Sequence, residues 1–180
     1  MLENSHTNIA SITYDINHFE RGQQSIDIIL KAFEQNKAYD STFNEHFARI
    51  PLMPRLVITD ASYHSMKLTG MRIIKNDSLR NAISNLYEQY YKFVLELNSN
   101  EWNVQFEDHR DIYRKKFSDF EFWSELVPVD YEQLKKDETY INYLKNRKGW
   151  LKFDIEMYRG RVNQTKDLIE AIQQELEARR

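Results

Sequence analysis

The sequence predicts an all-α fold, an elongated helical bundle in which long N- and C-terminal helices pack together with short helices between them. First, the chain has only 4 glycines and 3 prolines in 180 residues, which disfavours an all-β fold rich in tight turns. Second, apolar residues recur every three or four positions in both terminal segments, which is the period of a helix. Third, no segment alternates between apolar and polar residues for long enough to indicate a strand.

The N-terminal segment is predicted to form one helix from about Leu2 to Asn36. Its apolar side chains follow a heptad-like series in which Ser5 and Gln23 fill two polar slots. At 1.5 Å per residue, such a helix is roughly 50 Å long. Gly22 is expected to weaken or bend it beside Gln23. The apolar members of the series are Leu2, Ile9, Ile12, Ile16, Phe19, Ile26, Leu30 and Phe33.

The C-terminal segment repeats this pattern over a longer span, and Asp137 is its predicted N-cap. The helix is expected to run to the end of the chain. We call the strip of side chains that such a series forms along a helix its seam. Two seams in one chain most simply bury each other, so the first and last helices are expected to pack as coiled-coil-like partners. The second series is Ile141, Leu144, Lys148, Leu151, Ile155, Tyr158, Val162, Thr165, Ile169, Ile172 and Leu176.

Shorter helices are predicted between the two long ones. Thr59 or Asp60 is the expected cap of one, and Asp77 of the next, which ends at a break in NSNEWN. The face of that next helix is predicted to consist of Leu79, Ile83, Leu86, Tyr90, Phe93 and Leu97. The predicted short helices cover residues 41–49, 60–69, 77–97, 106–117 and 130–135.

The bulk properties are those of a single soluble helical domain spanning residues 1–180. The net charge of −3 is too small to gather nucleic acid or anionic lipid by bulk attraction. The absence of cysteine excludes disulfides, thiolate metal sites and cysteine nucleophiles. No run approaches the ~18 apolar residues of a membrane-spanning helix, and the polar start MLENSHTNIA does not resemble a signal peptide.

Two polar clusters are candidate metal or catalytic sites. Asp60 and His64 are four residues apart on a predicted helix, close enough for a hydrogen bond or for two metal ligands. A structural interaction without metal is the favoured interpretation, because two ligands alone do not make a site. The second cluster is interpreted as a solvated face and comprises Glu107, Asp108, His109 and Asp111. Sequence motifs for a nucleophile, a phosphate loop or a zinc protease are absent, and no cofactor is expected.

Two aromatic stretches also raise the question of binding. KNRKGWLK, residues 145–152, could grip single-stranded nucleic acid or anionic lipid headgroups. Trp150 adjoins the seam residue Leu151, however, and is expected to pack inward, so nucleic-acid binding is not predicted. FSDFEFWSEL, residues 117–126, is interpreted as the end of a helical core rather than as a ligand pocket.

Gly70 interrupts the helical stretch YHSMKLTGMRIIKNDSLRNA. A left-handed turn at this glycine is predicted to end one helix, since glycine tolerates that conformation best. Ile73 and Ile74 are expected to pin the connection to the core before Asp77 caps the next helix. A lone glycine without others at fixed spacing does not indicate a phosphate loop.

The same stretch resembles the central segment of a family of uncharacterised bacterial single-pass membrane proteins with a helical soluble domain of unknown function. The flanks ENSHTNIASITYDI and KDETYINYLKNRKGWLKF are also similar to that family, so the resemblance covers most of the chain. The family's basic N-terminus and transmembrane helix are not in this sequence. The specific matches are Tyr63, Thr69, Gly70, Ile73, Ile74, Asn76, Asp77, Leu79 and Arg80.

The resemblance implies a domain held at the cell membrane on its periplasmic side by a preceding segment. With the two seams, it favours a non-enzymatic protein-interaction or sensory domain that binds a protein partner or self-associates through its long helices. Two alternatives remain open, a cytoplasmic helical adaptor and an enzyme with an unfamiliar site near Asp60 and His64. The enzyme alternative predicts that these groups converge with other acids and have shifted pKa values.

Overall fold

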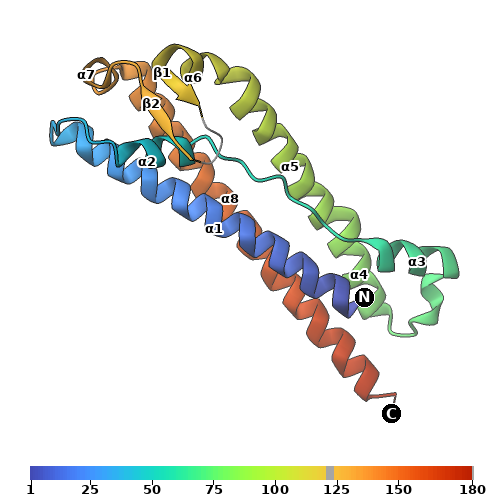
Figure 1. The fold of residues 1–180 in the computed structure, drawn as a ribbon. Helices are drawn as coiled ribbons and strands as arrows, with labels where there is room; N and C mark the ends of the chain where they lie inside the picture. The colour runs from blue at the N-terminus through green and yellow to red at the C-terminus, as the bar shows by residue number, and fades with distance from the viewer. Residues whose placement is uncertain (121–123, 180) are drawn as a thin grey trace. The chain divides into compact units, whose positions relative to one another are not determined.

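The computed structural model describes residues 1–120 and 124–179 and confirms the all-α fold (Figure 1). Helices α1 (Leu2–Glu34) and α8 (Glu138–Glu177) pack together, with shorter helices between them. The shorter α-helices are α2 (Phe43–Arg49), α3 (Ala61–Thr69), α4 (Asp77–Asn85), α5 (Lys92–Asn103), α6 (Arg110–Lys116) and α7 (Tyr131–Leu134). Three other helical segments are the 3₁₀ turn η1 (Met71–Ile73) and the π-helices η2 (Leu86–Tyr91) and η3 (Val104–Asp108).

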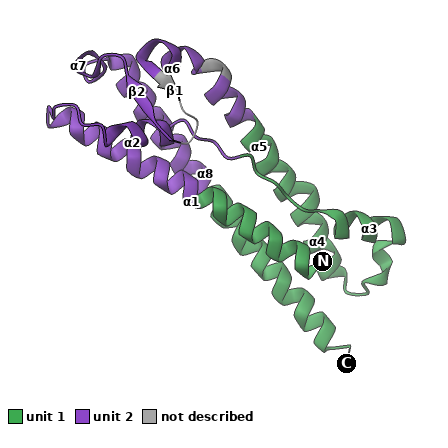
Figure 2. Ribbon diagram, viewed as in Figure 1, with its two compact units in different colours: residues 1–16, 55–99, 156–180 green, residues 17–54, 100–155 purple. Residues whose placement is uncertain are grey.

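The chain forms two compact units, each of which contains part of both long helices (Figure 2). Unit 1 consists of Met1–Ile16, Arg55–Ser99 and Glu156–Arg180. Unit 2 consists of Asn17–Pro54 and Asn100–Ile155.

Within unit 2, α1 and α8 lie close together and run antiparallel. A Cβ added to Gly22 would come within 3.2 Å of Leu151 Cδ1, so glycine permits this close approach. Gln23 Nε2 donates to the Lys148 carbonyl at 3.3 Å, and Lys148 forms an ion pair with Asp27. Gly22 does not interrupt α1, which is one continuous helix.

In both long helices, every second residue of the buried seam differs from the residue that the sequence predicted for that position. In α1 the seam uses Asn8 and Asp15 where the apolar pattern favoured Ile9 and Ile16, although Ile16 is buried as well. In α8 the corresponding polar residues are Arg147 and Asp154, although the predicted seam residues Ile155, Val162 and Ile169 are buried as well. The α1 seam is Ser5, Asn8, Ile12, Asp15, Phe19, Gly22, Ile26, Ile29 and Phe33. The α8 seam is Tyr140, Leu144, Arg147, Leu151, Asp154, Tyr158, Thr165, Leu168 and Ile172.

Some of these polar seam residues form hydrogen bonds with an extended segment, residues 50–59. Much of this segment is buried, although it forms neither a helix nor a sheet strand (Figure 1). A buried backbone needs hydrogen-bond partners, and side chains supply them here. In unit 1, Asn8 donates to the Thr59 carbonyl at 3.0 Å and accepts from the Thr59 N–H at 2.7 Å. Asn98 accepts from the Leu56 N–H at 3.1 Å.

Arg147 has the same role in unit 2. Its guanidinium donates to the carbonyls of Ile50, at 3.3 Å, and Leu52, at 3.0 Å. Another bond goes to the carboxylate of Glu101 at 3.3 Å. The guanidinium therefore joins three segments that are far apart in the sequence.

The predicted break at NSNEWN is wrong, because α4, η2, α5 and η3 form continuous helix over residues 77–108. The predicted buried face is correct through Leu86 and then shifts by one residue. The π-helix η2 causes this shift, since a π-turn inserts one extra residue into the helical repeat. Beyond it the buried residues are Tyr91, Val94, Asn98, Glu101 and Gln105 rather than Tyr90, Phe93 and Leu97.

A short antiparallel hairpin, which the sequence did not predict, joins β1 (Phe117–Phe120) to β2 (Leu126–Pro128). Strand β1 contains two of the four aromatic residues of the run, Phe117 and Phe120. Phe117 is buried, as a core interpretation requires, with its ring 5.4 Å from Phe47 and 5.8 Å from Tyr140. The other aromatic positions of that prediction, Phe122 and Trp123, lie outside the described residues.

Three of the predicted caps can be compared with the structure. Asp137 caps α8 as predicted, since its carboxylate accepts from the Tyr140 N–H at 3.0 Å. Asp77 does not cap α4. Asn76 does, by accepting from the Leu79 N–H at 3.1 Å. Asp60 precedes α3 but makes no side-chain cap bond.

Gly70 ends α3 with φ 97° and ψ 117°, and its N–H donates to the Met66 carbonyl at 3.0 Å. The positive φ agrees with the prediction, whereas ψ lies outside the left-handed helical region that was expected. Ile73 does not pin the connection, because its side chain is 68% exposed. Arg80 holds the connection instead, by donating to the Ile74 carbonyl at 2.5 Å and pairing with Asp77.

Replacing Gly70 with valine is expected to lower the free energy of unfolding by about 1–2 kcal/mol, because a β-branched residue is strained at positive φ. No atom lies within 4 Å of a Cβ added there, so backbone strain alone is tested. Urea denaturation measures the change. The control is Gly149→Ala in α8, which also has open space around the added Cβ and should raise the stability slightly. Equal stability of Gly70→Val and the parent protein would contradict the assignment.

Candidate functional site

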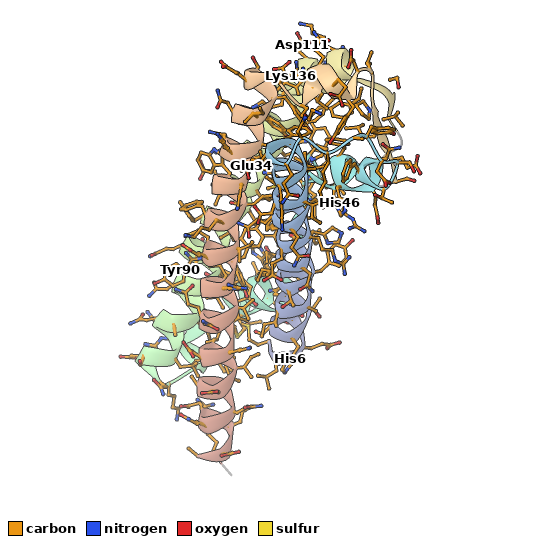
Figure 3. All side chains as sticks on the ribbon, turned by 90° about the vertical axis from the view of Figure 1, so that its left-hand side faces the viewer. His6, Glu34, His46, Tyr90, Asp111 and Lys136 are labelled. Carbon is orange, nitrogen blue, oxygen red and sulfur yellow. The ribbon has the colours of Figure 1, made fainter. Side chains whose placement is uncertain are left out.

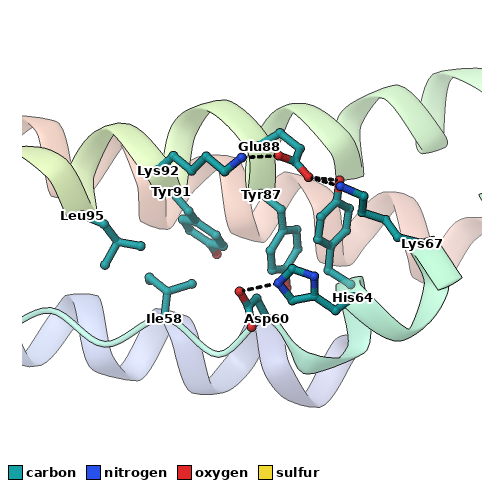
Figure 4. A pocket seen from close by; sticks show the side chains of 10 residues that line it. Ile58, Asp60, His64, Lys67, Tyr87, Glu88, Tyr91, Lys92 and Leu95 are labelled. Carbon is teal, nitrogen blue, oxygen red and sulfur yellow. Dashed lines mark hydrogen bonds and ion pairs between the residues drawn. The ribbon is translucent and has the colours of Figure 1, made fainter.

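Unit 1 contains an open groove of about 170 Å³ (Figure 4). Its walls come from the end of the extended segment, from α3, and from the continuous helix formed by η2 and α5. We call it the tyrosine groove. Its lining residues are Ile58, Asp60, Tyr63, His64, Lys67, Tyr87, Glu88, Tyr91, Lys92 and Leu95.

Three tyrosines provide the aromatic part of the tyrosine groove. The rings of Tyr63 and Tyr87 are stacked, with centroids 4.7 Å apart and planes inclined by 5°. Tyr91 meets Tyr87 edge-on at 5.2 Å, and its hydroxyl lies 2.7 Å from Thr165 Oγ1. Burial raises the pKa of Tyr63 and of Tyr87 to about 12. Both phenols therefore stay neutral at physiological pH and act as hydrogen-bonding and stacking groups.

Glu88 is the centre of the charged rim. It accepts hydrogen bonds from Lys67 at 2.7 Å, from Tyr63 at 2.8 Å, and from Lys92. These bonds, those from the two lysines first, lower the pKa of Glu88 to about 2, so its carboxylate is ionised at any physiological pH. Two cations thus share one anion on this side of the tyrosine groove.

The predicted Asp60–His64 pair forms on the opposite rim. His64 Nε2 lies 3.0 Å from Asp60 Oδ2, and both side chains are exposed. Among the described residues no three His, Asp or Glu side chains form a group that could hold a metal. The acid that shares the tyrosine groove with this pair is Glu88, and it is already bound to two lysines.

The tyrosine groove contains an unusual backbone element, since Tyr87, Glu88 and Tyr91 all belong to the π-helix η2. π-turns are rare and occur frequently at functional sites. Asp60 and His64 could be identified from their local spacing. The η2 residues could not, because nothing in the apolar pattern signals a π-turn.

The other predicted site residues do not come together with the tyrosine groove. Asp111 pairs with Lys115 at 2.9 Å on an exposed face, as expected for a solvated cluster. The His109 ring lies edge-on to Tyr143, with centroids 4.8 Å apart. The remaining members of that cluster, Glu107 and Asp108, have side chains outside the described part. Figure 3 places His6 on α1 and His46 on α2. His6 belongs to unit 1, whereas His46 belongs to unit 2.

The basic stretch at residues 145–152 divides into buried and exposed parts. The Arg147 side chain is 0% exposed and therefore is not part of a basic surface. The expectation that Trp150 packs inward is wrong, because this residue is 40% exposed. Its ring meets the equally exposed Phe153 edge-on at 5.9 Å.

Two buried carboxyl groups in the seams were not predicted. Asp154 in unit 2 is 1% exposed, and neither carboxylate oxygen has a hydrogen-bond partner among the residues that the structure describes. Its pKa is raised from 3.8 to about 7, first by burial and then by the negative charge of Glu101, while Arg147 opposes the shift. Asp15 in unit 1 is also buried, which raises its pKa to about 7. Asn8 and Asp15 are seven residues apart, as are Arg147 and Asp154, but this spacing alone does not distinguish buried polar residues from solvated ones.

Comparisons of the chain with models of protein families, with curated proteins and with solved structures give no match. Within the described ranges, no helix is long and apolar enough to cross a membrane.

The buried carboxyl groups make stability depend on pH. A carboxyl whose pKa is raised on folding destabilises the folded state once the pH exceeds its unfolded value. For Asp154 the pKa rises from 3.8 to about 7, so the free energy of unfolding should fall as the pH rises through that window. The expected loss is about 4 kcal/mol for this group.

Asp154→Asn should therefore be more stable than the parent protein at pH 8 and similar to it at pH 4. Urea denaturation at both values measures the difference. Asp167→Asn, an exposed aspartate of α8, is the matched control and should follow the parent profile. Parallel stability profiles for the parent protein and Asp154→Asn would show that Asp154 is not a buried, protonated group.

Proposed function

We propose that the chain is a non-enzymatic sensory domain of a membrane-anchored bacterial protein, with its soluble part facing away from the cytoplasm. The tyrosine groove is its ligand site. The π-helix η2 supports this most directly, because it contributes three of the lining side chains. The anchoring and its direction rest on the family resemblance, whose motif begins at the groove residue Tyr63.

Size and chemistry point to a small aromatic acid as the ligand. A cavity of about 150 Å³ is known to hold one benzene ring, and the tyrosine groove has about 170 Å³. Ile58, Leu95 and the tyrosine rings provide an apolar and aromatic surface for such a ring. Lys92 is 67% exposed and has three N–H donors, of which one bonds Glu88. The others are available for a ligand carboxylate.

The arrangement of charge favours a sensory role over the enzyme alternative. Each ionised group on the Glu88 side is paired with another, and the phenols of Tyr63 and Tyr87 stay protonated at neutral pH. A general base near neutral pH requires a group with an intermediate pKa beside the reacting atom. The imidazole of the tyrosine groove, that of His64, is hydrogen-bonded to Asp60 on the exposed rim.

Phenylacetate is the probe for this proposal, measured by isothermal titration calorimetry. It should bind with a Kd of about 0.1–1 mM, a value typical of such small ligands. Benzylamine has the same ring with the opposite charge and should bind at least tenfold more weakly. Lys92→Gln should weaken phenylacetate binding at least fivefold, whereas Lys152→Gln on α8 should leave it unchanged.

Two outcomes would overturn the proposal. Equal binding of benzylamine and phenylacetate would show that Lys92 does not bind the ligand carboxylate. No binding of either compound would show that the ligand is not a small aromatic acid. Chemical conversion of the probe, followed by chromatography, would favour the enzyme alternative.

A second candidate function, an interaction domain, is supported by Trp150 and Phe153. Exposed aromatic side chains in mutual contact on a long helix resemble the anchors of protein interfaces. If two copies associate through this face of α8, sedimentation equilibrium should show a dimer. The double variant Trp150→Ala/Phe153→Ala should be monomeric, and Tyr14→Ala, another exposed aromatic, should remain dimeric. A monomeric parent protein at high concentration would reject self-association.

A further inference from the structure

The turn between α3 and α4 presents isolated apolar side chains to solvent. We call residues 66–76 the basic corner, which belongs to unit 1. Leu68 is 89% exposed, more than any other large apolar side chain in the described ranges, and Ile73 is 68% exposed. Transfer of such side chains from water into an apolar phase is favourable.

The basic corner is also positively charged in a chain whose net charge is −3. Residues 66–76 include Lys67, Arg72 and Lys75 and contain no acidic residue. Lys67 is bound to Glu88 in the tyrosine groove. Arg72 and Lys75 are exposed, and neither makes an ion pair within the part of the chain that the structure describes.

Part of the backbone of the basic corner is hydrogen-bonded within the turn itself. The N–H groups of Gly70, Ile73 and Ile74 donate to the carbonyls of Met66, Gly70 and Met71, respectively. The Thr69 hydroxyl donates to the Ser65 carbonyl at 3.0 Å. A polar group that enters an apolar phase without a partner costs several kcal/mol. Internal pairing therefore lowers the cost of placing this turn at a lipid interface.

We propose that the basic corner docks on a bilayer surface rich in anionic lipid. Leu68 and Ile73 enter the boundary between headgroups and acyl chains, while Arg72 and Lys75 contact lipid phosphates. A protein partner fits less well, because a stable interface needs about 800 Å² and 20–30 residues on each side. A single turn with a few apolar side chains offers less than that, whereas insertion into lipid needs only the side chains themselves.

The proposal concerns a surface separate from the ligand-lining residues of the tyrosine groove, apart from Lys67. It is tested by co-sedimentation of the chain with vesicles at low salt. Vesicles of equal parts phosphatidylcholine and phosphatidylglycerol should bind at least tenfold more protein than vesicles of phosphatidylcholine alone. Arg72→Gln/Lys75→Gln should reduce partitioning about 30-fold, as expected from the electrostatic contribution of two cations. Leu68→Ser/Ile73→Ser should reduce it at least tenfold.

Matched control variants distinguish this docking from non-specific adsorption of the protein to vesicles. Val57→Ser/Val129→Ser removes exposed apolar side chains elsewhere, and Lys136→Gln/Lys152→Gln removes two exposed cations. Both control variants should partition as the parent protein does. Thermal unfolding of each variant confirms that it is folded.

A Leu68→Trp variant gives a second measurement of insertion. Indole fluorescence should shift to shorter wavelength when anionic vesicles are added, relative to the parent protein. Three results would overturn the proposal: equal binding to both kinds of vesicle, loss of binding in the control variants, or full binding by Leu68→Ser/Ile73→Ser. A dimer that this last variant abolishes, without vesicle binding, would instead assign the basic corner to a second copy of the chain.

Discussion

The rest of the structure depends on one requirement, which is to bury residues 50–59 without a helix or a sheet. Backbone N–H and C=O groups in such a segment must find partners among side chains. In unit 1 those partners are Asn8 and Asn98, and in unit 2 the partner is Arg147. Polar residues therefore occupy positions that an ordinary heptad seam would give to leucine or isoleucine. The cost of this arrangement is largest for Arg147, a fully buried charge that Glu101 balances.

This requirement explains which parts of the fold could be predicted from the sequence. The extents of α1 and α8 follow from apolar periodicity, which is a local property. The choice between Ile9 and Asn8 as the seam residue is not local, because it depends on where Thr59 lies, 51 residues away. The face of α5 was displaced by one residue for a related reason. The π-turn in η2 displaces that face, and no residue type in LYEQYY specifies such a turn.

The candidate site likewise contains some contacts that the sequence predicts and others that it does not. The Asp60–His64 pair is four residues apart on one helix, so its spacing alone indicated contact. The bond from Tyr63 to Glu88 spans 25 residues and requires α3 to lie against η2. The notable glycine of the sequence, Gly70, is not among the residues that line the tyrosine groove. Its positive φ ends α3 one turn after Lys67, the last residue of that helix that lines the tyrosine groove.

The position of the polar seam residues in unit 1 gives them a structural role beyond stability. Apolar residues at these sites would remove the desolvation cost, but they would leave the backbone of the extended segment unpaired. The Asn8 side chain bonds both backbone groups of Thr59, the residue immediately before Asp60 and next to Ile58. Those two neighbours form one wall of the tyrosine groove, and α3 begins at the next residue. The seam of α1 therefore determines where the groove wall stands, because a side chain that bonds two backbone groups fixes both the position and the orientation of the segment it holds.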